Sequence, residues 1–195
     1  FIVSRYNENL DWITILRDNI VLYNKGNELK NWNYTKLKNV GRESDTYLHY
    51  IIENYNSLPD YCVFTQGNIE DHAANGYIYL ISIAIEAVEN GKSNPRFRSS
   101  EGCWSPDFNL KEKGGAFSNY QNNKVISFRN WFIENINKEY PKILQGYQNG
   151  LFAVSKKKIL QNTIDYYIKL KKTVEWHINP VEGHFLERSW YYIFE

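Results

Sequence analysis

The sequence predicts an α/β fold in which a mostly parallel, Rossmann-like central sheet is flanked by helices. The first 70 residues alternate between short apolar runs and amphipathic stretches, in the order strand, helix, strand, helix, strand. This alternation is typical of parallel sheets, because parallel neighbours need a crossover that is usually helical. Polar clusters follow the apolar runs, as they do where such sheets carry their sites. The 195 residues suit a single domain, 1–195, with a sizeable core.

Composition excludes several classes of protein. Hydrophobic residues make up 43% and charged residues 23%, which are ordinary globular values. A net charge of +1 offers no basic field, so we expect no nucleic-acid partner. No apolar run approaches the ~20 residues that span a bilayer, and there is no signal-peptide pattern, so we expect no membrane span and a cytoplasmic location. Because the chain opens on Phe1 and contains no Met, we expect it to be a trimmed piece.

The first elements are short. Residues 1–4 (FIVS) predict a strand, and Asn9 is placed to cap a short helix. A second strand is expected at 20–23 (IVLY), stopped by the Asn-Lys-Gly that follows, and 27–39 reads as a polar loop. The short helix is supported by apolar residues at helical spacing, Leu10, Ile13 and Leu16.

The best-defined elements lie between residues 43 and 91. A helix is indicated by one apolar face made of Tyr47, Leu48, Ile51, Ile52 and Tyr55. A buried strand follows at 62–64, with Cys62 as a buried thiol. Residues 77–90 predict a second helix, for which Gly91 is a good C-terminal residue. The isoleucines of 77–90 would also suit a buried strand, but the length favours a helix.

The second half is less regular. Periodicity vanishes over 92–123, and a segment of this length without structure is usually functional or disordered. A helix is expected at 125–140, closed by Pro141, and a buried strand at 150–155 (GLFAVS). That strand leads into a helix whose apolar and basic positions run from Ile159 to Lys172. Two cysteines, Cys62 and Cys103, form no disulfide framework and no CxxC metal spacing.

The candidate site is built from four polar clusters that follow strands or open a helix. Because the carboxyl ends of parallel strands share one edge, these clusters are expected to converge on one crevice. Any one cluster alone reads as a helix cap or a surface ion pair, whereas four at the same edge indicate a site. The clusters are Arg5, Asn7 and Glu8; Asn24 and Lys25; Arg42 and Glu43; and Gln66, Asn68, Asp71 and His72.

Two groups of side chains suit more specific roles. Glu70, Asp71 and His72 can hold Mg²⁺ or Mn²⁺, which prefer hard ligands and keep positions for water and phosphate. His184 shares a helix face with Glu187 and Arg188 if a helix has begun there. The alternative for Glu187 and Arg188 is a structural ion pair.

Several familiar motifs are absent from the sequence. Without GxGxxG after a strand, GxxxxGK[ST], HExxH or GxSxG, the dinucleotide, P-loop, zincin and α/β-hydrolase interpretations have no support. The 16 Tyr, 10 Phe and 6 Trp suit either a core built from rings or a surface that stacks on sugars. For the second role the expected platform is Trp104 or Trp190.

Five segments together resemble a known family. They are RYNEN at 5–9, YNKG at 23–26, NVGRESDTYLHYI at 39–51, LPDYCVFTQGNIEDH at 58–72 and HFLERSWYYIF at 184–194. They resemble a small domain family of poorly characterised function that is grouped with GT-A glycosyltransferases and is found in fungi, bacteria and large DNA viruses. The resemblance implies a GT-A fold, a nucleotide-sugar donor and often a divalent metal, Mn²⁺ or Mg²⁺.

The resemblance also implies roles for individual residues. Arg5, Tyr6 and Asn7 would lie by the donor base or ribose, and Gly41 and Arg42 near the donor. The crevice residues Lys25 and Gln66 complete the expected donor site.

The resemblance also implies which residues lie near the metal and near the acceptor. Asn68, Asp71 and His72 would occupy the place of an Asp-x-Asp metal motif, although this segment reads Asn-Ile-Glu-Asp. His184 would match a late metal or diphosphate contact, and Glu187 a carboxylate near the acceptor.

The implied activity is transfer of a sugar from a nucleotide-sugar donor to a glycan or other hydroxyl acceptor. The leaving diphosphate must be neutralised, by a metal or by Arg42, Lys25 or His184. If the anomeric centre is inverted, a carboxylate must take the acceptor proton, and the candidates are Asp71, Asp107 and Glu187; if it is retained, no such base is required. A non-catalytic nucleotide- or sugar-binding domain is the first alternative, and a metal-assisted hydrolase the second.

Overall fold

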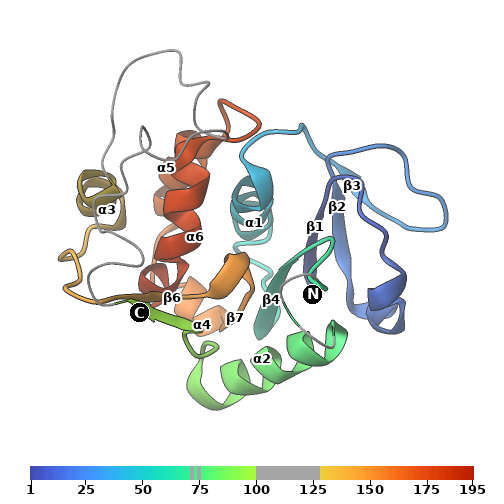
Figure 1. Ribbon diagram of the computed structural model, residues 1–195, viewed down its shortest axis with the longest axis horizontal. Coiled ribbons are helices and arrows are strands. Elements are labelled where there is room, and N and C mark those ends of the chain that lie inside the picture. The colour runs from blue at the N-terminus through green and yellow to red at the C-terminus, as the bar shows by residue number, and fades with distance from the viewer. Residues whose placement is uncertain (71–72, 74–75, 100–127) are drawn as a thin grey trace.

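A computed structural model describes residues 1–70, 73, 76–99 and 128–195 (Figure 1). Its central sheet has five strands in the order β3-β2-β1-β4-β7. The four strands from β3 to β4 are parallel, and β7 pairs antiparallel with β4 at one edge. The mixed α/β class and the mostly parallel sheet are therefore confirmed. The strands are β1 Ile2–Arg5, β2 Val21–Asn24, β3 Thr35–Lys36, β4 Tyr61–Gln66 and β7 Phe152–Ser155.

The register of the sheet aligns the carboxyl ends of three strands. Ser4 of β1 pairs with Tyr23 on one side and with Gln66 on the other, and Arg5 pairs with Asn24. The polar residues that end these strands therefore lie side by side at one edge of the sheet, which is the geometry required for a shared site.

Helices cover both faces of the sheet. Alternate strand residues point to opposite faces, so Ile2 joins one core and Val3 the other. The first core contains residues of α1 Arg42–Glu53, α3 Phe128–Ile136, α5 Ile164–Val174 and α6 Val181–Ile193. The second contains residues of η1 Asp11–Asn19 and α2 Tyr77–Asn90, and Figure 1 shows α2 on the far side of the sheet from α1.

Aromatic rings form the centre of the first core. Phe152 of β7 has its ring centroid 4.9 Å from Phe64, 5.1 Å from Tyr147 and 5.2 Å from Trp190. Trp190 is fully buried. The sequence interpretation of Trp190 as a sugar-stacking platform is therefore wrong, because its ring fills the space between β7 and α6. Trp104 lies outside the described residues.

The remaining elements connect these layers. β5 Phe97–Ser99 and β6 Leu144–Gly146 form a separate two-stranded antiparallel sheet. η2 Gln148–Gly150 precedes β7, and α4 Lys156–Ile159 follows it. No helix in the described ranges is both long enough and apolar enough to cross a membrane.

Several expected elements differ in detail. The single helix expected around Ile159–Lys172 is two helices, because the Thr163 side chain accepts a hydrogen bond from Tyr166 N and starts α5 afresh. The helix expected to reach residue 140 ends at Ile136, and the next residue, Asn137, adopts a positive φ of 55° that stops a helix. The first short helix is of the 3₁₀ type, and the loop expected at 27–39 contains β3. The irregular segment expected at 92–123 begins with β5, and residues 100–123 lie outside the described residues.

Candidate functional site

A cavity of about 250 Å³ lies at the carboxyl edge of the parallel strands. All four polar clusters noted in the sequence contribute to its walls, since each supplies at least one lining side chain. The lining residues are Ser4, Arg5, Tyr6, Glu8, Lys25, Asn39, Arg42, Glu43, Gln66 and Ile178. The strand register and the start of α1 thus bring together residues from five separate stretches of the chain.

Arg5, at the end of β1, is buried and engaged with the protein itself. Its Nε donates to Glu8 O at 2.8 Å, and its Nη1 donates to Asn24 Oδ1 at 2.9 Å. Nη1 also lies within hydrogen-bonding distance of the carbonyl oxygens of Tyr6 and Asn27. The guanidinium therefore ties together the loops that follow β1 and β2, and it forms part of the cavity wall.

Lys25 is likewise buried, and its ammonium group holds the start of α1. It donates to Val40 O and Arg42 O, both at 2.6 Å, and to Asp45 Oδ2 at 2.9 Å. Burial lowers the pKa of Lys25, and Asp45 acts in the opposite direction. Because an ammonium group has three hydrogens, these bonds leave none for a diphosphate.

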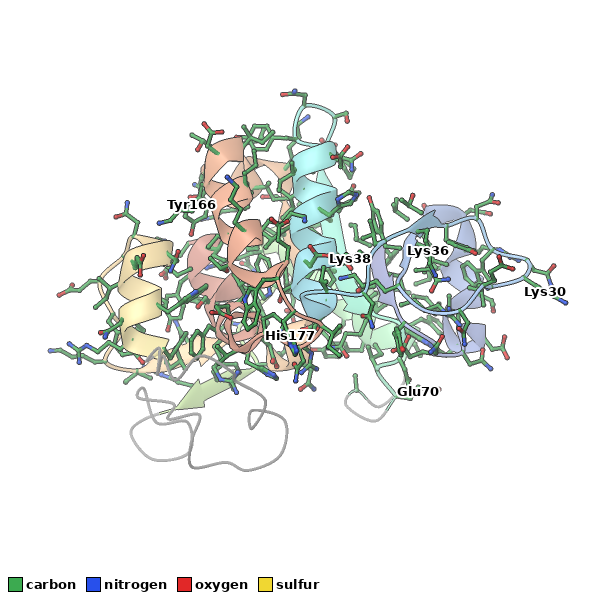
Figure 2. The ribbon with its side chains drawn as sticks, turned by 90° about the horizontal axis from the view of Figure 1, so that it is seen from above. Lys30, Lys36, Lys38, Glu70, Tyr166 and His177 are labelled. Atoms are coloured by element: carbon green, nitrogen blue, oxygen red, sulfur yellow. The ribbon has the colours of Figure 1, made fainter. Side chains whose placement is uncertain are left out.

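The start of α1 has an unusual backbone. Gly41 has φ 63° and Arg42 has φ 51°, both in the left-handed region. Gly41 N donates to His177 O at 2.8 Å, and Figure 2 shows His177 beside the first turn of α1. A Cβ on Gly41 would lie 2.5 Å from Asp45 Cβ, so this position requires glycine. Gly41 does not line the cavity; its turn orients the residue that follows.

Among the described cations that line the cavity, Arg42 is the accessible one, with its side chain 40% exposed. Its Nη1 lies 3.2 Å from His184 Nε2 and 3.5 Å from Asn179 Oδ1. Its Nε lies 3.5 Å from the Glu43 carboxylate. These contacts hold the Arg42 guanidinium at the cavity wall. Part of the guanidinium stays open to solvent.

His184, on α6, is placed behind Arg42. Burial, reinforced by the charges of Arg42 and Arg188, lowers the pKa of His184 to about 4. Nε2 of the neutral ring lies 3.2 Å from both Arg42 Nη1 and Asn179 Oδ1, so the tautomer decides whether it accepts from the arginine or donates to the asparagine, and Nδ1 lies 3.9 Å from Glu187 Oε2. His184 thus contacts the cavity residue Arg42, whereas Glu187 lies behind His184, and neither is among the described lining residues.

The metal site expected from Asp71, His72 and His184 stays a prediction, since only His184 among these residues is described. Two guanidinium groups flank the ring, and one of them faces Nε2. Within the described ranges, no group of three or more His, Cys, Asp or Glu residues is placed to hold a metal. The expected ligands Asp71 and His72, and the candidate base Asp107, lie outside the described residues, as does Cys103.

The other expected donor-binding residues differ in placement. Tyr6 lines the cavity and is 50% exposed, so its ring is available to a ligand. Asn7 Oδ1 accepts from Asn27 N, and Asn68 Oδ1 accepts from Glu70 N. Both asparagines are exposed, lie outside the cavity lining, and shape the loops after β1 and β4.

Sequence reasoning gave Glu43 no specific role, although its side chain is only 8% exposed and it lines the cavity. The sequence feature that could have pointed to Glu43 is its position next to Arg42 at the start of a helix. No sequence pattern pointed to Ile178, which lines the cavity, or to Asn179, which contacts Arg42 from 137 positions along the chain.

Comparison with family models places all of these residues in one family domain. Residues 1–195 match a family described as "Protein of unknown function (DUF3431)". The chain belongs to the DUF3431 family. Searches of curated proteins and of solved structures each found no match. The match covers the strand ends, α1 and α6, so the whole cavity lies inside the DUF3431 domain.

Proposed function

We propose that this DUF3431 domain is a GT-A-like glycosyltransferase that moves a sugar from a nucleotide-sugar donor to a hydroxyl acceptor. The observation that carries the proposal is the cavity at the carboxyl edge of the parallel strands, where α/β sheets bind ligands. It combines an exposed tyrosine, an accessible arginine and a buried carboxylate in about 250 Å³.

Each of these groups matches one part of a nucleotide sugar. The ring of Tyr6 suits a flat base, because aromatic faces stack on one another. The guanidinium of Arg42 suits the diphosphate, which it can contact through two parallel hydrogen bonds. Glu43 and Gln66 supply oxygen acceptors, which suit hydroxyl groups.

Sugar transfer requires that the charge on the leaving group be stabilised and, for an inverting reaction, that a base accept a proton. The bond between the anomeric carbon and the diphosphate oxygen breaks, and a bond to the acceptor oxygen forms. Arg42, an accessible cation at the cavity wall, is the residue that we propose stabilises the negative charge on the leaving diphosphate. For an inverting reaction, the acceptor proton goes to a carboxylate, for which Glu187 is the described candidate beside Asp71 and Asp107.

Thermal unfolding with a panel of nucleotide sugars tests the proposal. Each compound is tried with and without Mn²⁺, since a divalent metal belongs to the same proposal. A ligand at a hundredfold excess over its Kd is expected to add about 2.7 kcal/mol to the free energy of unfolding. Arg42→Ala should abolish the shift, whereas Arg17→Ala, which removes an exposed arginine stacked on Trp32, should preserve it. Absence of a shift with every nucleotide sugar would overturn the proposal.

Turnover separates the transferase from a binding module that uses the same cavity. A transferase releases the nucleoside diphosphate when a mixture of glycan acceptors is supplied with the donor that gave the thermal shift. A binding module gives the shift without release. Release without any acceptor would instead indicate a hydrolase.

A further inference from the structure

The side chain of Glu43 is only 8% exposed, lines the cavity, and accepts no hydrogen bond from the described residues. Glu43 occupies the second position of α1, and its cation neighbour is Arg42, with Nε at 3.5 Å. No N–H or O–H group of the described residues donates a hydrogen bond to this carboxylate. Removing a carboxylate from water without replacing its hydrogen bonds costs free energy. A carboxylate with little solvent contact and no hydrogen bond from the described residues is suited to accept hydrogen bonds from a ligand.

Two residues of the protein lie close to Glu43 on the side away from the cavity. Gly150, with φ 67°, passes close enough that a Cβ on it would lie 3.7 Å from Glu43 Oε1. One turn along α1, Tyr47 is fully buried, and Glu43 contributes to raising the pKa of its hydroxyl. The protein therefore covers the back of the carboxylate and leaves the side toward the cavity for a ligand.

Two neighbouring side chains provide a comparison. Glu8 also lines the cavity, but its Oε2 accepts a hydrogen bond from Tyr6 N at 2.6 Å, so it is committed to the protein. Gln66 is fixed by its Nε2, which donates to Asn149 O at 2.8 Å. This bond orients the amide and keeps Gln66 Oε1 as an acceptor on the same cavity.

We infer that Glu43, supported by Gln66, is a hydroxyl-recognition subsite that accepts hydrogen bonds from a pair of hydroxyl groups on the ligand. A phosphate is repelled from this carboxylate, so the anionic part of the ligand lies at Arg42 and the hydroxyl-bearing ring at Glu43. The ribose of a nucleotide and the ring of the transferred sugar both carry such hydroxyls. The inference rests on the proposed function where the ligand is a nucleotide sugar, and it adds the residue that determines selectivity and the orientation of the ligand.

Calorimetric titration of Glu43→Gln tests the inference. The probes are UDP-glucose, GDP-mannose, glucose 1-phosphate and inorganic pyrophosphate. Loss of a charged acceptor should weaken binding of the hydroxyl-bearing probes about tenfold to a hundredfold and leave pyrophosphate binding unchanged or tighter. Glu53→Gln is the matched control, because it removes a carboxylate from the exposed end of the same helix. It should bind every probe as the unsubstituted protein does.

Thermal stability without ligand distinguishes recognition from a structural role. If Glu43 serves the ligand, Glu43→Gln removes a carboxylate that accepts no hydrogen bond from the described residues and has only a long contact with Arg42, and its Tm should equal or exceed that of the unsubstituted protein. A lower Tm with unchanged affinity for the hydroxyl-bearing probes would overturn the inference. Comparing UDP with UDP-glucose identifies the source of the hydroxyls. If UDP binding itself depends on Glu43, the ribose supplies them; if only UDP-glucose binding depends on Glu43, the transferred sugar supplies them.

The two proposals fail in different ways. If glucose 1-phosphate binds through Glu43 but no nucleotide sugar binds, the proposed function is wrong and the subsite stands. If nucleotide sugars bind equally well to Glu43→Gln, the subsite is wrong and the proposed function stands. If neither glucose 1-phosphate nor any nucleotide sugar of the panel binds, both are wrong.

Discussion

Single side chains at the cavity divide into those that complete the protein and those that face a ligand. Arg5 and Lys25 are buried cations whose hydrogens go to protein acceptors. Arg42 and Glu43 also belong to the wall, but the first is partly exposed and the second accepts no hydrogen bond from the described residues. Residue type alone does not separate these groups, since each contains an arginine; only the bonding partners do.

His184 makes stability depend on pH in a defined window. Its folded-state pKa of about 4 lies below the ordinary 6.5, mainly through burial. Above pH 6.5 the ring is neutral in both states, so it contributes nothing to the pH dependence. Between pH 6.5 and 4 the unfolded chain binds the proton and the folded chain does not, so stability falls as the pH falls.

The expected loss from His184 is up to about 3 kcal/mol between pH 7 and 4. His184→Gln removes the titrating group, so the variant should lose that much less over the same range. Urea unfolding at pH 7, 5.5 and 4 measures the difference. If the difference in unfolding free energy between the two proteins does not change with pH, the lowered pKa of His184 is contradicted.

Among the elements, α1 is the one on which the cavity depends. Its left-handed start at Gly41 and Arg42 is held from outside by Lys25, which bonds the carbonyl oxygens before and within the first turn. Asp45 then lies 2.9 Å from both Lys25 and Lys171, which joins α1 to β2 and to α5. The position of Arg42 and Glu43 therefore follows from a buried ion-pair network beneath them.

Asp45→Asn should destabilise the protein by about 3–5 kcal/mol, because it leaves the buried ammonium of Lys25 without its counter-charge. Glu175→Gln is the control, since Glu175 also pairs with Lys171 at 2.9 Å but is 45% exposed. It should cost less than about 0.5 kcal/mol, as exposed pairs do. Urea denaturation at pH 7 measures both. Equal losses of unfolding free energy in the two variants would show that burial does not strengthen the network.

At the scale of the whole molecule, two cores share one sheet and differ in composition. The core around α1, α5 and α6 contains most of the large rings, whereas that around η1 and α2 is mainly aliphatic. Contacts among the rings join β4, β7 and α6, which meet near the middle of the molecule in Figure 1. The aromatic surplus in the sequence is thus mainly a packing feature.

Two tryptophans provide a matched test of this interpretation. Trp190→Ala should lower the free energy of unfolding by about 3–5 kcal/mol, because it empties a fully buried site. Trp176→Ala, at a position 53% exposed, should cost less than about 1 kcal/mol. Chemical denaturation of both variants measures the difference. A loss for Trp176→Ala as large as that for Trp190→Ala would contradict the assignment of the core.

The sequence by itself determined the class of fold and the edge of the sheet at which polar groups gather. Apolar runs and helical spacing are local properties, so β1, β2, β4 and α2 could be placed from the residues alone. The helix from Ile159 to Lys172 was placed less well, since the capping bond at Thr163 competes with a continuous apolar pattern.

Only the tertiary structure decided which polar side chains remain for a ligand. Lys25 belongs to the predicted donor site, yet its three hydrogens go to Val40, Arg42 and Asp45. Glu43 had no assigned role, yet its carboxylate meets the cavity without a donor from the described residues. His184 reaches Arg42 across 142 positions of the chain. Hydrogen-bond partners depend on distances in space, and local sequence patterns do not encode those distances.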